Sequence, residues 1–280
     1  MKNVTGGGVK WLDVPAERFP GWIASFAVRH GDPAAAPGPG LVTFTAADGA
    51  TAECHPPFAE SFRLPTAGPA PHAPPAPRDP PTPHGPPAPH APRDPPAPQA
   101  PPAPPAQAGA TGDPAPVRDD QQLAGLVAAV AAHAAAPRTV GVLLVRLGGY
   151  AAGVFTGYPP ALADAKTGSR PVHGRSAAGG WSQQRFARRR NKQVDEALRA
   201  AADTAVLVFA RWQARGPALD AVVLGGDKRA VAGLRDDPRL APYLALATER
   251  FITVPDPRRS VLEAAPVQFT AVRIKLSPPA

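Results

Sequence analysis

The sequence predicts a mixed α/β protein, in which a mixed β-sheet is covered by helices and follows a small helix-plus-hairpin module. Three observations support this fold class. Apolar residues recur at helical spacing near residues 19 and 123, Val- and Leu-rich runs predict strands, and from residue 139 hairpin strands give way to alternating strands and helices. This order is typical of a mixed sheet flanked by helices. We therefore divide the 280 residues into 1–64, 65–116 and 117–280.

Residues 1–64 are expected to form a small α+β module. Four apolar residues within 14–30 share one helical stripe at i, i+3, i+4 and i+7: Phe19, Trp22, Ile23 and Phe26. This spacing predicts an amphipathic helix. Residues 41–45 and 51–55 are prone to form strands, and Asp48-Gly49 lies between them. An Asp-Gly pair between two such runs indicates a β-hairpin.

Residues 65–116 are rich in proline and are expected to form a disordered insertion. Twenty of the 41 prolines fall within 65–105. Proline has no backbone N–H and fixes φ, so such a run favours extended polyproline II over a packed core. The segment contains an imperfect repeat, at 71–81 and 89–96. It is interpreted as a spacer or tolerated insertion, and a ligand for a proline-binding domain is the alternative.

Residues 117–280 are expected to form the larger domain. Asp119-Asp120 can cap a helix whose apolar residues again follow i, i+3, i+4 and i+7 spacing. A Gly-, Ser- and Arg-rich loop is expected over 167–182, followed by a long helix over 183–213. Shorter helices are expected after Asp227 and between the last two strands. Apolar runs predict six strands, at residues 139–147, 150–155, 161–166, 219–224, 250–254 and 267–276.

The positive charge of the chain is concentrated in residues 166–199, here called the basic segment. The whole chain has a formal charge of +8, and this segment of 34 residues has nine Lys or Arg against two acidic residues, a net +7. A basic balance of this kind favours a polyanionic partner. We expect this partner to be RNA rather than DNA. The candidate RNA-binding residues are Lys166, Arg170, Arg175, Arg185, Arg188, Arg189, Arg190 and Lys192.

The compartment is expected to be the cytoplasm. Cys54 is the single cysteine, so no disulfide can form within the chain. The residues after Met1 lack the apolar stretch of a signal peptide. No uncharged apolar run reaches the roughly 18 residues that a membrane span needs, so no membrane partner is expected.

Candidate chemistry is concentrated where the expected loop meets the long helix. Gly179-Gly180 allows positive φ and close approach to another molecule. Ser182, Gln183 and Gln184 follow, and they supply a hydroxyl and two amides with no titratable acid. The arginines come next, and their planar guanidinium groups suit phosphate. A helix-capping Ser182 and an anion-binding loop without catalysis are simpler interpretations of the same residues.

Other familiar sites fit poorly. Ser182 lies in no Gly-x-Ser-x-Gly elbow, and the chain has no Walker-type phosphate loop. The histidines and Cys54 lack metal-site spacing, and His173 is interpreted as a solvated loop residue. Asp164 and Asp227 lie near strand ends, but no third carboxylate accompanies them. No metal or cofactor is expected.

The run Gly-Gly-Trp-Ser-Gln-Gln-Arg-Phe-Ala-Arg-Arg-Arg-Asn at 179–191 resembles the signature of actinobacterial Vms-like release-factor-type peptidyl-tRNA hydrolases. Four further runs are similar to that family, at residues 149–155, 166–170, 224–229 and 249–257. The resemblance covers roughly residues 118–280. It implies an RNase-H-like mixed sheet related to the middle domain of class-I eukaryotic and archaeal release factors, with the catalytic loop ahead of a long helix.

The resemblance also implies the substrate and the site. The expected substrate is peptidyl-tRNA in the peptidyl-transferase region of the large ribosomal subunit, and the expected outcome is rescue of stalled nascent chains. Relatives have Gly-Gly-Ser-Gln or Gly-Gly-Gln, whereas this chain inserts Trp181 and has two glutamines. Alignment on Ser-Gln assigns the working role to Gln183, with Gln184 as the open alternative. Gly179, Gly180 and Ser182 complete the expected catalytic loop.

Two other functions remain open. The same fold could cut the tRNA 3′ CCA end as an endonuclease, which the eukaryotic relatives suggest. The arginines could instead serve a non-catalytic adaptor that binds RNA or the ribosome.

Overall fold

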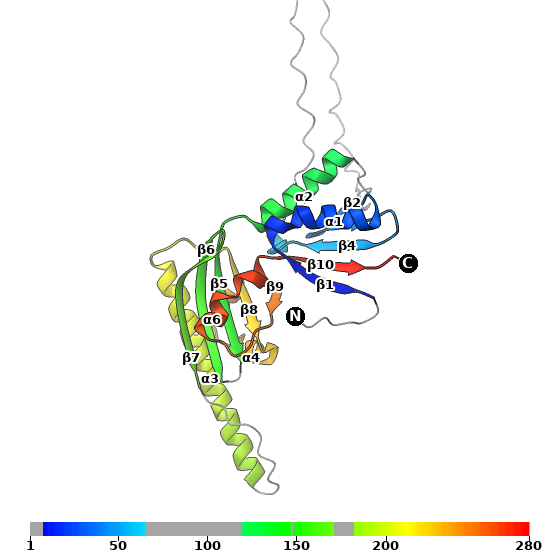
Figure 1. Ribbon diagram of the computed structural model, residues 1–280. Coiled ribbons are helices and arrows are strands. Elements are labelled where there is room, and N and C mark those ends of the chain that lie inside the picture. Colours follow the sequence, from blue (N-terminus) through cyan, green and yellow to red (C-terminus); the bar gives the residue numbers. More distant parts are fainter. Residues whose placement is uncertain (1–7, 65–118, 147, 171–181, 280) are drawn as a thin grey trace, which may run out of the picture. The chain divides into compact units, whose positions relative to one another are not determined.

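The computed structural model describes residues 8–64, 119–146, 148–170 and 182–279 (Figure 1). These residues form two five-stranded β-sheets with helices packed against them. The predicted class, a mixed α/β protein with a mixed sheet flanked by helices, is confirmed. The proline-rich segment 65–116 lies outside the described residues.

The first sheet is antiparallel throughout, in the order β1-β10-β4-β3-β2. Its strands are β1 (Lys10–Val14), β2 (Ala34–Gly38), β3 (Leu41–Thr45), β4 (Thr51–His55) and β10 (Val272–Ser277). Helices α1 (Phe19–His30) and α2 (Asp120–Ala134) supply the apolar side chains that pack on this sheet, and 3₁₀ turns lie at Ala16–Arg18 and Ala59–Ser61.

The predicted hairpin of the first sheet is confirmed. Thr45 pairs with Thr51, and the carboxylate of Asp48 accepts a hydrogen bond from the Ala50 amide at 2.9 Å. Gly49 has φ of +90°, which is why an Asp-Gly pair suits this turn. Strand β2 was not predicted, because Ala34–Gly38 contains no β-branched or aromatic residue.

Two elements that the sequence assigned to residues 117–280 belong to the first sheet. Strand β10 pairs with β1 on one side and with β4 on the other. Helix α2 buries Val127 and Val130 among the side chains of α1 and the first sheet. Its predicted cap is present, since Asp119 Oδ1 accepts a hydrogen bond from the Gln121 amide at 2.8 Å. The boundary predicted at residues 64 and 117 therefore does not separate the two sheets.

The second sheet is mixed, in the order β7-β6-β5-β8-β9. Its strands are β5 (Arg138–Arg146), β6 (Gly149–Gly157), β7 (Ala161–Ser169), β8 (Ala221–Gly226) and β9 (Ala247–Ile252). β6 runs antiparallel to both β5 and β7, whereas β8 is parallel to β5 and β9 is parallel to β8. All five strands were predicted to within three residues at each end.

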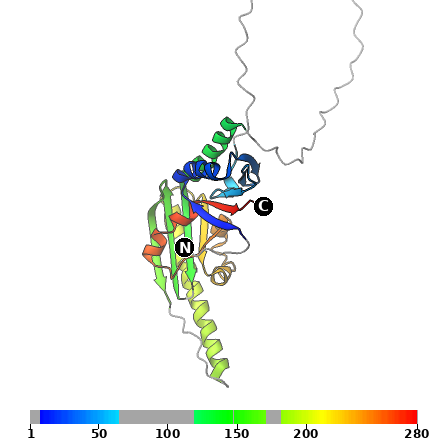
Figure 2. The ribbon, with the colours of Figure 1, turned by 45° about the vertical axis from the view of Figure 1, so that its right-hand side comes forward.

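Helices cover both faces of the second sheet (Figures 1 and 2). The long helix α3 (Ser182–Gln213) packs on one face together with α4 (Lys228–Ala232) and α5 (Ala241–Leu244). Two short helices, α6 (Arg259–Glu263) and α7 (Pro266–Phe269), pack on the other face. β5 alternates between these cores, since Leu143 and Val145 face α3 while Val142 and Leu144 face α6.

Candidate functional site

The predicted catalytic run follows β7 in sequence and continues into the first turn of α3. Gly179, Gly180 and Arg175 fall within 171–181 and lie outside the described residues, as does His173. Helix α3 begins at Ser182, so the backbones of Gln183 and Gln184 belong to its first turn. The expected loop is shorter at its start, because β7 continues to Ser169 instead of ending at Lys166.

The chain leaves the sheet toward this run at a fixed point. Ser169 pairs with Gly149, and the Arg170 amide donates a hydrogen bond to the Gly148 carbonyl at 3.0 Å. Tyr150 packs directly over Gly168, since a β-carbon there would lie 2.5 Å from the tyrosine ring. Packing of this closeness fixes the direction in which the chain leaves β7.

The candidate RNA-binding side chains that the structure describes are exposed. Lys166 and Arg170 lie on and just after β7, and Arg188, Arg189 and Lys192 lie on α3. Lys192 pairs with Glu196 at 4.0 Å, but its side chain is 80% exposed. An exposed pair at this distance contributes little, so Lys192 keeps its cation available to a partner.

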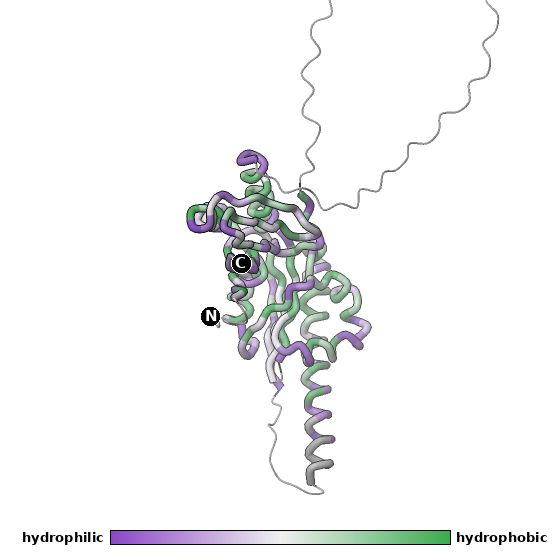
Figure 3. Tube along the Cα trace, turned by 90° about the vertical axis from the view of Figure 1, so that its right-hand side faces the viewer, coloured by the Kyte–Doolittle hydropathy of each residue, from purple (hydrophilic) through white to green (hydrophobic). Residues whose placement is uncertain are grey.

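The opposite end of α3 holds the helix on the sheet. Ala201, Ala205, Val208 and Phe209 are buried against the second sheet. Figure 3 shows the same pattern as hydrophobic colouring along the part of α3 that runs beside the sheet. The apolar contacts thus lie toward the carboxyl end of α3, while the exposed arginines lie toward its amino end.

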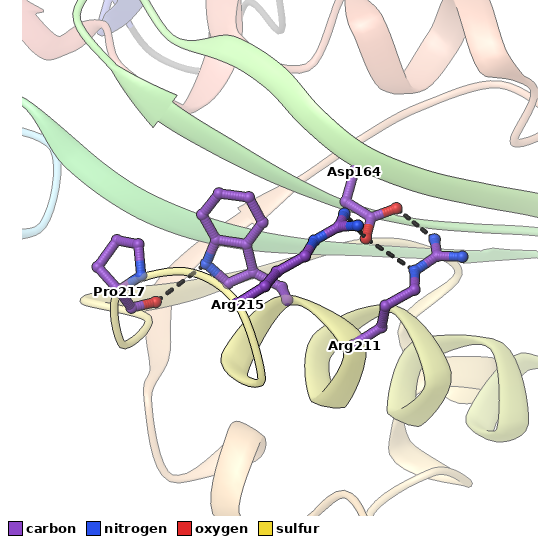
Figure 4. Close-up of polar contacts among 5 residues, drawn as sticks. Asp164, Arg211, Arg215 and Pro217 are labelled. Atoms are coloured by element: carbon purple, nitrogen blue, oxygen red, sulfur yellow. Dashed lines mark hydrogen bonds and ion pairs between the residues drawn. The ribbon is translucent and has the colours of Figure 1, made fainter.

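Asp164 on β7 reinforces this attachment (Figure 4). Its side chain is 6% exposed and accepts hydrogen bonds from two arginines of α3 and the turn that follows it. Arg211 Nε donates at 2.9 Å and Arg215 Nη2 at 2.6 Å, both to Oδ2, and Arg211 Nη2 donates to Oδ1. Both carboxylate oxygens are therefore engaged, and Asp164 is a structural anchor rather than half of a metal pair.

We expect Asp164→Asn to lower the free energy of unfolding by about 2 kcal/mol. Losing one partner of a buried ion pair is costly, but Arg211 and Arg215 are 43% and 53% exposed and can regain water. Chemical denaturation measures this change. The matched control is Asp203→Asn, which removes an exposed carboxylate paired with Arg239 and should cost under about 1 kcal/mol. Equal losses in both variants would contradict the anchor.

The remaining candidates for metal or nucleophilic chemistry have structural roles. Asp227 caps α4, since its Oδ1 accepts a hydrogen bond from the Arg229 amide at 2.8 Å. Cys54 is fully buried in the first sheet, and burial raises the pKa of its thiol, which disfavours a reactive thiolate. Within the described ranges, no three His, Cys, Asp or Glu residues are grouped so as to hold a metal ion.

The Gly-Gly-Trp-Ser-Gln-Gln run thus joins the second sheet to the long helix α3, which carries exposed arginines toward its amino end. Residues 138–275 match the family described as Actinobacteria/chloroflexi VLRF1 release factor. The resemblance inferred from residues 179–191 is thereby confirmed. The match runs from the start of β5 into β10, so it contains the whole second sheet and its helices.

Comparison of whole structures adds a partial similarity. The crystal structure of the archaeal translation termination factor aRF1 is 15% identical, with a TM-score of 0.35, over 47% of this chain. The chain matches 36% of the length of that factor. No curated protein matches the sequence. Among the helices that the structure describes, none has the length and apolar character required to cross a membrane.

Proposed function

We propose that this protein hydrolyses the ester bond of peptidyl-tRNA and so frees nascent peptides from stalled ribosomal complexes. The observation that supports this function is the position of the Gly-Gly-Trp-Ser-Gln-Gln run. It lies inside the range matched by the release-factor family, after the edge strand β7 and extending into the first turn of α3. The working partners are the tRNA and the large ribosomal subunit.

The chemistry requires few protein groups. Ester hydrolysis needs a water directed at the carbonyl carbon and hydrogen-bond donors for the developing oxyanion. A glutamine amide donates and accepts hydrogen bonds without titrating. A backbone N–H can supply the oxyanion donor, an interaction typically worth about 10²–10³ in rate. No step in this scheme requires a metal ion or an acidic side chain.

The helical backbone makes the two glutamines inequivalent. Gln183 and Gln184 both belong to α3, and successive residues of an α-helix point about 100° apart. We assign the working role to Gln183, which the alignment on Ser-Gln selects.

The arginines supply the affinity for RNA. Arg185, Arg188, Arg189 and Lys192 follow i, i+3, i+4 and i+7 spacing, which places them along one face of α3. Phosphate contacts from such a face position an RNA without reading its sequence. The helix end that bears these residues is also the end at which the glutamines lie.

We expect Arg188→Ala with Arg189→Ala to weaken binding to large ribosomal subunits and to flatten its salt dependence. Each phosphate contact that is lost should reduce the log–log slope by about 0.7–0.9. Equilibrium binding at four or more salt concentrations measures the slope. The control is Arg29→Ala, an exposed arginine of α1 near the first sheet. An unchanged slope in the double variant would assign both arginines to a solvated face.

The product of the reaction tests the function itself. Purified protein is mixed with ribosome–nascent-chain complexes, and the peptide and the tRNA are followed on the same gel. Free peptide with full-length tRNA is the expected result. Free peptide with a tRNA shortened at its 3′ end would show the endonuclease instead. Stable binding with neither product would leave the adaptor as the function.

A further inference from the structure

Four strands of the second sheet end on the same side. β5, β8 and β9 are mutually parallel, and β7 runs in their direction because β6 is antiparallel to both β5 and β7. We call this side the carboxyl edge. It consists of the ends of these strands at Arg146, Ser169, Gly226 and Ile252, with the segments that follow them as far as Arg170, Lys228 and Arg258.

Each of these strand ends contributes a cation to the carboxyl edge. The four residues are Arg146 at the end of β5, Arg170 after β7, Lys228 after β8 and Arg258 after β9. Arg170, Lys228 and Arg258 are exposed, and the side chain of Arg146 is 45% exposed. The basic segment contributes only Lys166 and Arg170 to β7 and the residue after it. Three of the four cations of the carboxyl edge therefore lie outside the basic segment.

Backbone contacts bring the cations of β5 and the segment after β9 together. Arg146 Nη1 donates a hydrogen bond to the Val254 carbonyl at 2.9 Å. The neighbouring Pro257 packs on Gly149, where a β-carbon would lie 3.3 Å from the proline ring. The segment after β9 thus crosses back over the end of β5 and the start of β6, and it carries Arg258 with it.

The other two cations are fixed to the same edge by similar contacts. The Arg170 amide donates to the Gly148 carbonyl, one residue before β6 begins. Lys228 Nζ lies 5.8 Å from the centre of the Phe251 ring near the end of β9. Gly226 pairs with Val145, which places the start of α4 beside the end of β5.

The carboxylates near this edge compensate only part of the charge. Asp256 lies 3.9 Å from Arg146 Nε and is 72% exposed, so the pair is weak. Asp227 is committed to the amides that begin α4. At the opposite edge, Arg138 is half-buried over the Phe58 ring, and Asp220 accepts a hydrogen bond from the Thr139 amide. Exposed positive charge therefore distinguishes the carboxyl edge.

We propose that the carboxyl edge is a second RNA-binding surface, which contacts phosphates through Arg146, Arg170, Lys228 and Arg258. The inference rests on the proposed function for its choice of RNA as the partner. Local contacts fix the chain near four separate strand ends, which together present an array of cations along one edge of the sheet. Such an array suits the backbone of a folded RNA and does not read base sequence. The surface binds RNA independently of the arginines of α3.

The test compares two variants that lose the same charge at different places. The first combines Arg170→Gln, Lys228→Gln and Arg258→Gln. The second combines Lys10→Gln, Arg18→Gln and Arg29→Gln, which are exposed residues of the first sheet and its helical segments. Binding to deacylated tRNA and to bacterial large ribosomal subunits is measured separately over a range of salt concentrations.

We expect the carboxyl-edge variant to lose about 2 units of log–log salt slope with at least one of the two RNAs, and the control variant to lose under half of that. The RNA that shows the loss identifies the ligand. Equal losses in both variants, or no loss in either, would overturn the proposal. If the two triple variants differ in melting temperature, the single variants Arg170→Gln and Arg258→Gln are measured as well. At least one of these single variants must then show a smaller log–log salt slope than the wild type. The protein could fail to hydrolyse peptidyl-tRNA while the carboxyl-edge variant still shows a reduced salt slope. This result would support the RNA-binding surface and reject only the proposed hydrolysis.

Discussion

Gln183→Ala is expected to slow peptide release from ribosome-bound peptidyl-tRNA by about 10²-fold or more, because the amide that positions water or stabilises the transition state is lost. Single-turnover release from a defined complex measures the rate. The melting temperature and the affinity for ribosomes should stay close to wild type. Gln183 lies in the first turn of α3, whereas the apolar contacts of that helix lie toward its other end.

Neighbouring variants separate the glutamine from its surroundings. Gln184→Ala should cost less than Gln183→Ala, because the two side chains point in different directions on the helix. Gln193→Ala is the matched control, since it removes the same amide further along α3 and should release peptide at the wild-type rate. Gly180→Ala should be damaging if that glycine adopts positive φ.

The outcomes identify the working residue. An inactive Gln184→Ala with an active Gln183→Ala would shift the assignment by one residue and keep the proposed reaction. Wild-type release by both single variants and by the double variant would exclude glutamine chemistry. The adaptor function would then explain the basic residues better.

Gly226→Ala is expected to lower the free energy of unfolding by about 3 kcal/mol. Gly226 has φ of +104°, a region that other residues rarely adopt, and a β-carbon there would lie 2.1 Å from the Val145 carbonyl oxygen. The same oxygen accepts a hydrogen bond from the Asp227 amide at 2.8 Å. Relief of the clash must therefore disturb both the end of β8 and the cap of α4. Urea denaturation measures the loss.

Gly157→Ala is the matched control for this prediction. Gly157 also has positive φ, at +79°, but a β-carbon there would have no atom within 4 Å. Gly157→Ala therefore introduces backbone strain but no steric clash. It should lower the free energy of unfolding by about 1 kcal/mol. A loss in Gly226→Ala no larger than that in Gly157→Ala would show that the strand end adapts easily.

The elements that the sequence predicted are those with local signals. Asp119 caps α2 with its own side chain, and Asp48-Gly49 forms the turn between β3 and β4. The Val- and Leu-rich run of β5 was predicted because it is buried on both faces. Strands β1 and β2 were missed, since Lys10–Val14 pairs with the distant β10 and not with a neighbouring strand, and Ala34–Gly38 is rich in alanine. The pairing of β10 with β1 and β4 depends on contacts between distant residues, which no local pattern encodes.

The candidate site was predicted in the same uneven way. The arginines of α3 were found because they are consecutive in sequence. Arg146, Lys228 and Arg258 were missed because sheet topology brings them to one edge from distant segments. Arg146 and Arg258 are more than 100 residues apart in the sequence. The signal that could have indicated them is the repeated occurrence of Arg or Lys at the end of a predicted strand or within four residues after it. The structural role of Asp164 was not predicted, since its partners Arg211 and Arg215 lie at the far end of a long helix.

The position of β10 has a consequence for the order in which the chain can fold during its own synthesis. β1 has a single neighbour in the first sheet, and that neighbour is β10, more than 250 residues later. While the chain emerges amino end first, the main-chain groups of β1 have no strand to pair with until residue 277 has been made. The first sheet can then contain only β2, β3 and β4. The second sheet, whose strands lie between residues 138 and 252, can form before the first is complete.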